Sequence, residues 1–348
     1  MDKMQRIDLR SDTVTLPTAE MMNAIHSAVL GDDVYVEDSS TIELEKLAAN
    51  VTGKESALLV SSGTMGNLIC NLVHCKRGTE VIMGHKSHTF IYEAGGISAF
   101  GGIHSHQLKN DTQGLIALDD IKEAIREDNV HFPKTSLISL ENTHNKCFGA
   151  PLSKDYIDVV SEISKSNNLK LHIDGARIFN ATVSLNISLS SLVENVDSIT
   201  FCLSKGLSCP IGSVICGSEE FIYSARRMRK ALGGGMRQAG VIASAGLVAL
   251  KTMNDQIKID HQNAKLLADG LSNIKNIILD TNKIHTNIIY FKLADDIMNA
   301  KEFLKTMENA GILFFESFEN QYRLVTHSGI TQDDIDNAVK IFEKQLSF

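Results

Sequence analysis

Short apolar runs alternate with amphipathic segments through the first two thirds of the chain. Between residues 51 and 218, runs rich in aliphatic and β-branched residues predict strands at 56–62, 80–84, 135–141, 169–174, 198–202 and 212–217. Segments between them, such as 118–128 and 153–168, carry apolar residues at helical spacing. This alternation is typical of an α/β layer with a largely parallel sheet.

The pattern changes after residue 218. A helical stretch over 219–274 precedes segments that we predict as a strand at 286–293, a helix at 300–311, strands at 312–317 and 321–329, and a helix at 331–348. The last helix opens with Thr331 and has Asp334 three positions on, close to a capping box. We therefore expect a large domain over 1–250, with the N-terminal segment, and a small α+β domain over 251–348.

Composition narrows the class of protein. The 348 residues are 43% hydrophobic with a net charge of −8, and the densest basic run is residues 226–230, which argues against nucleic-acid binding. No apolar run approaches the roughly 20 residues of a membrane span, and the N-terminus lacks the apolar core of a secretory signal. Six cysteines without a CxxC pair indicate reduced thiols in a cytoplasmic protein.

Two charged residues follow predicted strands. Asp174 ends the strand at 169–174, and Lys205 comes just after the strand at 198–202. In open α/β sheets, ligands bind at the carboxyl ends of the strands. Pyridoxal phosphate (PLP) sites combine a Schiff-base lysine with an aspartate that faces the pyridine nitrogen. The pair therefore predicts a PLP site in which the ring nitrogen meets Asp174.

A phosphate site and an aromatic contact complete this prediction. Ser62, Gly63 and Thr64 follow a predicted strand and open a helix, whose N-terminus suits a phosphate. The junction is neither a P-loop nor a dinucleotide fingerprint. His88 could stack on the cofactor ring. His85 and His88 have a spacing that metal sites use, but no acidic or cysteine partner follows at a recognisable interval, so we expect no metal.

These residues lie within a longer resemblance. The chain resembles the low-specificity L-threonine aldolases, PLP enzymes of the aspartate-aminotransferase fold type (fold type I). Nine blocks match in order: IDLRSDTVT, GDDVY, SGTMGN, SHTFIYE, HFPKTSLISLENTH, HIDGARIFN, FCLSKGL, GGGMRQAG and RLVTH. The resemblance departs at Val36 and Ser39, where the family carries glycine and proline, and at residues 145–149, which replace a Gly-Gly pair.

The resemblance implies a role for each matching residue. It makes Lys205 the Schiff-base lysine, Asp174 the partner of the ring nitrogen, Gly63 and Thr64 the phosphate ligands and His88 the stacking residue. It makes Ser11, Arg177 and Arg323 ligands of the substrate carboxylate, which matches the planar fork of arginine. Tyr35 and Tyr92 would line the pocket, and Lys230 and Arg237 would reach the phosphate of a neighbouring subunit. A homo-oligomer with shared sites, such as a dimer of dimers, follows.

The implied reaction is the cleavage of L-threonine and L-allo-threonine to glycine and acetaldehyde. His88 and His131 compete for the role of the base that removes the β-hydroxyl proton, and an ordered water could replace either. Two alternatives stay open. One is another PLP enzyme, a β-eliminating lyase or an aminotransferase, and the other is a non-catalytic protein that binds PLP.

Overall fold

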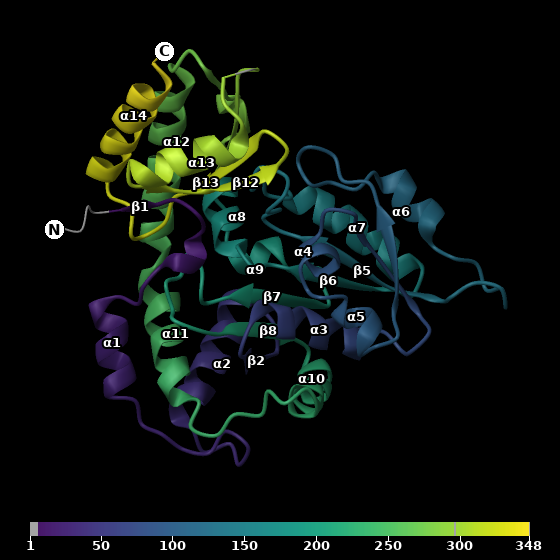
Figure 1. The fold of residues 1–348 in the computed structure, drawn as a ribbon. Coiled ribbons are helices and arrows are strands. Elements are labelled where there is room, and N and C mark those ends of the chain that lie inside the picture. The colour runs from purple at the N-terminus through teal and green to yellow at the C-terminus, as the bar shows by residue number, and fades with distance from the viewer. Residues whose placement is uncertain (1–5, 296, 348) are drawn as a thin grey trace.

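A seven-stranded sheet forms the centre of the computed structural model, which describes residues 6–295 and 297–347 (Figure 1). Its strand order is β2-β8-β7-β6-β5-β3-β4. The strands are β2 (Ser56–Val60), β3 (Glu80–Gly84), β4 (His104–Leu108), β5 (Thr135–Glu141), β6 (Lys170–Asp174), β7 (Ser198–Cys202) and β8 (Ser213–Gly217). All six predicted strands are present, and β4 is the one that the sequence pattern missed.

The sheet is mostly parallel, as predicted. β3 pairs in parallel with β4 and β5, and β6 does so with β5 and β7. β8 runs antiparallel to both β2 and β7. Consequently β3, β5, β6 and β7 all point their carboxyl ends to the same edge of the sheet, where a ligand site is expected.

Helices cover both faces of this sheet. On one face the largest core cluster packs residues of α2 (Ser39–Thr52), α7 (Lys154–Ser166), α8 (Ile178–Leu185) and α11 (Gly240–Thr252) against the strands. On the other face lie α3 (Gly63–His74) and α10 (Glu219–Ala231). The shorter helices are α1 (Ala19–His26), α4 (His88–Ile91), α5 (Gly96–Ala99), α6 (Leu118–Ala124) and α9 (Leu189–Leu192), with a 3-10 turn at η1 (Asp12–Val14).

The C-terminal part is a smaller α+β unit. Its antiparallel sheet has the order β12-β13-β10-β9. The elements are α12 (Asn254–Ser272), β9 (Ile277–Ile278), η2 (Thr281–Lys283), β10 (Ile288–Leu293), α13 (Ala300–Asn309), β11 (Ile312–Leu313), β12 (Phe315–Phe318), β13 (Gln321–Val325) and α14 (Gln332–Leu346). The predicted capping box of α14 is present, with Thr331 and Asp334 bonding reciprocally.

The N-terminal segment crosses to this smaller unit. β1 (Ile7–Asp8) pairs in parallel with β11, and Ile7 and Leu9 are buried in the C-terminal core. The apolar side chains of these N-terminal residues therefore have their partners in the small unit, while the predicted domain of residues 1–250 includes them. The boundary near residue 250 stays a prediction.

Within the described ranges, no helix combines the length and the apolar character that crossing a bilayer requires.

Candidate active site

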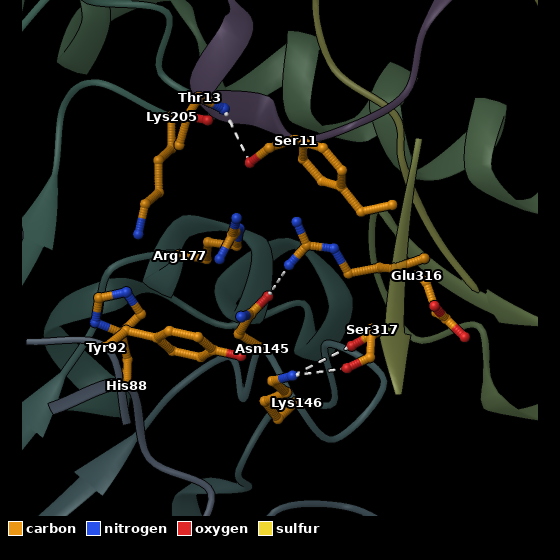
Figure 2. A pocket seen from close by; sticks show the side chains of 12 residues that line it. Ser11, Thr13, His88, Tyr92, Asn145, Lys146, Arg177, Lys205, Glu316 and Ser317 are labelled. Atoms are coloured by element: carbon orange, nitrogen blue, oxygen red, sulfur yellow. Dashed lines mark hydrogen bonds between the residues drawn. The ribbon is translucent and has the colours of Figure 1, made fainter. Parts of the chain in front are cut away.

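A cavity of about 350 Å³ lies between the carboxyl edge of the large sheet and the small unit (Figure 2). Six of the predicted site residues line it: Ser11, His88, Tyr92, Arg177, Lys205 and Arg323. They come from segments that are far apart in the chain. Thr13, Asn145, Lys146, Phe315, Glu316 and Ser317 complete the lining.

Lys205 enters the cavity from the loop after β7. Its backbone carbonyl accepts bonds from the Ser208 N–H at 2.8 Å and the Thr15 hydroxyl at 3.0 Å, so the loop is held from two sides. Figure 2 shows the Lys205 side chain extending into the cavity on the side of His88. Its half-buried amine is therefore positioned to react with a bound carbonyl compound.

Asp174 lies at the end of β6 and is 3% exposed. Its Oδ2 accepts a bond from Asn67 Nδ2 at 2.9 Å, and its Oδ1 accepts one from the Ala176 N–H at 3.1 Å. Among the described residues, no lysine or arginine lies within salt-bridge distance of it. A buried carboxylate is costly unless a positive group meets it. A protonated pyridine nitrogen would supply that charge.

His88 is linked to Asp174 through two buried side chains. Its Nδ1 lies 2.9 Å from Glu93 Oε1, and the same oxygen accepts a bond from Asn67 Nδ2, also at 2.9 Å. A carboxylate can only accept, so Nδ1 carries the proton and Nε2 is left as an acceptor. Burial alone would lower the pKa of His88, but the bond to Glu93 and the charges of Asp174, Glu93 and Glu141 raise it.

His88, Glu93 and Asp174 place three potential metal-ligand atoms within 4.8 Å of one another. His85, the other histidine of the spacing noted above, is not part of this group, and its Nδ1 accepts a bond from the Asn110 N–H at 2.9 Å. Asn67 donates to both carboxylates. The described hydrogen bonds therefore account for the closeness of the three side chains.

Two arginines face the cavity in different electrostatic settings. Arg177 donates from Nε and NH2 to Asp12 at 2.7 and 2.6 Å. Burial would raise the pKa of Asp12, but this guanidinium holds it well below its usual range. Arg323 has neutral partners, Asn145 Oδ1 at 2.7 Å and the Arg10 carbonyl at 2.9 Å, and burial followed by the charge of Arg177 lowers its pKa. An anion beside Arg323 would stabilise its positive charge.

The predicted phosphate site is the N-terminus of α3. Ser62 caps the helix by accepting from the Met65 N–H at 3.1 Å, and Ser62 and Thr64 are exposed. A Cβ at Gly63 would lie 2.8 Å from Cys202 Sγ, at the end of β7 and three residues before Lys205. Glycine thus permits the close approach of α3 to β7. Asn67 on the same helix donates to Asp174, so α3 contacts both the aspartate and the strand that precedes Lys205, and these residues fit PLP.

Besides Asp174 and residues 62–64, four other predicted residues do not line this cavity. Tyr35 is 72% exposed, Lys230 is exposed at the end of α10, and exposed Arg237 pairs with Asp32 at 3.2 Å. His131 is exposed before the start of β5, whose far end, Glu141, accepts from the His88 N–H at 2.7 Å. Seven strand residues span roughly 20 Å. Within one chain, therefore, His131 lies far from the cavity that His88 lines, and the choice between the two histidines as the base stays a prediction.

Sequence reasoning missed several residues that organise the site, namely Asp12, Asn67, Glu93, Asn145 and Lys146. Asp12, Asn67 and Glu93 lie inside blocks that were noted for a neighbouring residue. Glu93 follows His88 by five positions, and Asp12 follows Ser11 directly. Their partners are far away in sequence: 165 residues separate Asp12 from Arg177, and 178 separate Asn145 from Arg323. Position within a block was the only available signal.

Comparisons with known proteins agree with this geometry. The model of the β-eliminating lyase family matches residues 8–294. Low-specificity L-threonine aldolase 1 of Arabidopsis thaliana is 45% identical over 99% of this chain and 97% of its own length. The low specificity L-threonine aldolase of Escherichia coli K12 is 39% identical over 94% and 96%. The threonine aldolase structure from Leishmania major shares the fold, with a TM-score of 0.83, 18% identity and coverage of 97% and 99%. The chain thus belongs to the β-eliminating lyase family and, within it, to the low-specificity L-threonine aldolases.

Proposed function

We propose that this protein uses PLP to cleave L-threonine and L-allo-threonine to glycine and acetaldehyde. One observation carries the proposal: a single cavity brings together Lys205, an arginine without an acidic partner among the described residues and a histidine whose Nε2 is left as an acceptor. The names of the relatives, which match almost the whole chain, support the same reaction.

The residues that would hold PLP have distinct tasks. Lys205 would bind it covalently, Asp174 would stabilise positive charge on the ring nitrogen, and the N–H groups at residues 62–64 would hold its phosphate. His88 would lie against the ring. When bound, PLP supplies an electron-poor ring that takes up the electron pair of the breaking Cα–Cβ bond.

The two arginines would bind the carboxylate of the substrate. Arg323 would meet the α-carboxylate with its planar fork, and Arg177 would add the donors that Asp12 leaves free. The Ser11 hydroxyl, buried beside Asp12, would complete the carboxylate site. Holding the carboxylate at several points fixes which bond at Cα is aligned for cleavage.

His88 would move the proton. Its Nε2 would accept the β-hydroxyl proton, directly or through an ordered water, while the Glu93 carboxylate stabilises the resulting imidazolium. The Cβ–O bond becomes a carbonyl as the Cα–Cβ bond breaks. Protonation at Cα then gives glycine.

A shared site in a homo-oligomer, formed as a dimer of dimers, is part of the proposal. Tyr35, His131, Lys230 and Arg237 lie outside the cavity of their own chain and are exposed. Such residues could serve the site of a symmetry-related copy, because a two-fold axis brings the same surfaces together reciprocally. We also propose a cytoplasmic location, in keeping with six buried cysteines that form no disulfide.

The decisive experiment is product analysis. The holoenzyme is given L-threonine, L-allo-threonine, their D-forms and L-serine, with and without added PLP. Acetaldehyde and glycine from the L-isomers support the aldolase. The family model that matches the chain is named for β-elimination, and pyruvate with ammonia from serine would favour that second function instead. Bound PLP with no turnover would contradict both.

A further inference from the structure

We propose that the cavity also accepts β-hydroxy amino acids with a second carboxylate, the simplest being 3-hydroxyaspartate, and that Lys146 recognises that carboxylate. The inference rests on the function proposed for the same cavity and names a substrate class for it. Lys146 lies in the segment where the chain departs from its family, so the inference concerns this chain in particular.

Lys146 stands on the wall that faces the β-substituent. Its ammonium lies 5.4 Å from the ring centroid of Tyr92 and 4.1 Å from that of Phe318. Tyr92 in turn lies 5.4 Å from His88, ring centroid to ring centroid. Figure 2 shows Lys146 beside Tyr92, on the side away from Lys205. Because the β-hydroxyl must face His88, the neighbouring β-substituent is directed toward Tyr92 and Lys146.

Among the residues that the structure describes, Lys146 is the cation of the cavity lining to which neither an acidic partner nor a role in binding the cofactor or the α-carboxylate has been assigned. Of the four cationic side chains in the lining, Arg177 is paired with Asp12, Lys205 is used by the cofactor, and Arg323 meets the α-carboxylate. Lys146 remains. Its Nζ donates to the Ser317 carbonyl and hydroxyl at 3.3 Å each, which are neutral partners.

No carboxylate of the described residues lies within 4.0 Å of the Lys146 ammonium. Glu316 also lines the cavity, but it is exposed, and its Oε1 accepts from the Asn320 N–H at 3.0 Å. In Figure 2 its carboxylate points away from the centre of the cavity. A half-buried ammonium with two long bonds to neutral groups has a donor to spare for an anion.

The reaction is balanced without any additional reactant. The Cα–Cβ bond of 3-hydroxyaspartate breaks, the β-hydroxyl loses its proton to the base and becomes a carbonyl, and Cα gains a proton. The products are glycine and glyoxylate in place of glycine and acetaldehyde. Nothing is oxidised or reduced overall.

The experiment compares substrate ratios in the holoenzyme. The kcat/KM values for L-3-hydroxyaspartate (both β-epimers) and L-threonine are measured for the wild type and for Lys146→Met, Lys146→Arg and Lys283→Met. Lys283 is the matched control. Its ammonium also lies near an aromatic ring, 5.3 Å from the ring centroid of Phe148, but Lys283 is not part of the cavity lining. A second readout is the inhibition constant of L-aspartate relative to L-asparagine, since neither ligand has a β-hydroxyl to cleave.

We expect Lys146→Met to lower the ratio of kcat/KM for hydroxyaspartate to kcat/KM for threonine about ten-fold, because a charge-assisted bond is lost. The preference of the enzyme for aspartate over asparagine as an inhibitor should fall by a similar factor. Lys146→Arg should restore both ratios, and Lys283→Met should leave them unchanged. If threonine is cleaved but neither ratio responds to Lys146→Met, Lys146 only ties its loop to Ser317 and the inference is overturned while the proposed function stands. If no acetaldehyde forms from threonine, the proposed function fails, and this inference with it.

Discussion

At the scale of single residues, Glu93 determines the protonation of His88. The carboxylate accepts from His88 Nδ1 and, through Asn67, is linked to Asp174. A base must be neutral to accept a proton, so cleavage should rise with pH through the pKa of His88, which lies above the usual value for histidine.

We predict that Glu93→Gln moves the acidic limb of the kcat/KM profile for threonine to lower pH by about one unit, because the charge that favours the imidazolium is lost. The pH profile of the purified variant checks this. Glu80→Gln is the control. Glu80 is also buried and its Oε1 lies 3.2 Å from His106 Nδ1, but this pair lies at the opposite edge of the sheet. A limb that stays in place in Glu93→Gln, or moves equally in both variants, would contradict the assignment.

The burial of Asp260 predicts that the stability of the fold depends on pH. It is buried in α12, and burial raises its pKa to about 7, against a partial opposing effect of the bond from Gln256. Between about pH 4 and 7 the folded protein therefore binds a proton that the unfolded chain does not. Stability should fall as pH rises through this window, by up to about 4 kcal/mol from this group.

We expect Asp260→Asn to remove that loss, since an amide can still accept from Gln256. The free energy of unfolding, from urea titrations at pH 5 and pH 8, should differ less between the two pH values in Asp260→Asn than in the wild type. Asp255→Asn, at an exposed position of the same helix, should keep the wild-type difference. Equal pH dependence in the wild type and Asp260→Asn would disprove the account of Asp260.

At the scale of elements, the loop between α1 and α2 carries the departure from the family at Val36. The backbone of Val36 has a φ of 60°, a left-handed conformation that a β-branched residue adopts at a cost and glycine adopts freely. The Val36 N–H donates to the Asp33 carbonyl at 3.2 Å and the Glu37 N–H to the Asp32 carbonyl at 3.0 Å. These bonds hold the turn in place at Val36, where the resemblance leads us to expect glycine.

Val36→Gly should therefore stabilise the protein by about 1 kcal/mol, the relief of strain exceeding the added freedom of the unfolded chain. Urea unfolding measures the change. Val34→Gly, an exposed valine of the same loop outside the positive-φ region, should show no gain. If both variants lose stability equally, the strain at Val36 is not real.

The elements that sequence could predict are those with a strong local pattern. The six predicted strands are apolar because neighbours cover both faces of the sheet. β4, with the sequence His-Ser-His-Gln-Leu, is an edge strand with polar positions and gave no such signal. β1 has two residues and exists through its pairing with β11, more than 300 positions later, which no local pattern can reveal.

The same distinction applies to the site. Asp174 and Lys205 were predictable because a charge at the end of an apolar strand is a local feature. The pairing of Asp12 with Arg177, and the bond from Asn67 to Asp174, depend on elements that meet only in the folded chain. His131 was proposed as a base because it lies in a matching block, and its distance along β5 from the cavity became visible only in three dimensions.

At the scale of the whole molecule, the proposal that subunits share their sites predicts that defective subunits can complement each other. Lys205→Ala and Arg237→Ala are each expected to be nearly inactive. If Arg237 serves the neighbouring subunit, a hybrid dimer of the two has one site with both native residues. Random mixing should then restore about a quarter of the wild-type activity. No recovery after verified subunit exchange would show that each chain uses its own Arg237.

The position at which the cofactor is attached can be located directly. The holoenzyme is reduced with borohydride, digested, and its peptides are examined by mass spectrometry. Two lysines line the cavity, Lys205 and Lys146, so the method can tell them apart. We predict one pyridoxyl group per chain, on Lys205, and none in Lys205→Ala. A pyridoxyl group on Lys146 or on any other lysine, or no modified peptide from an enzyme that cleaves threonine, would contradict the account.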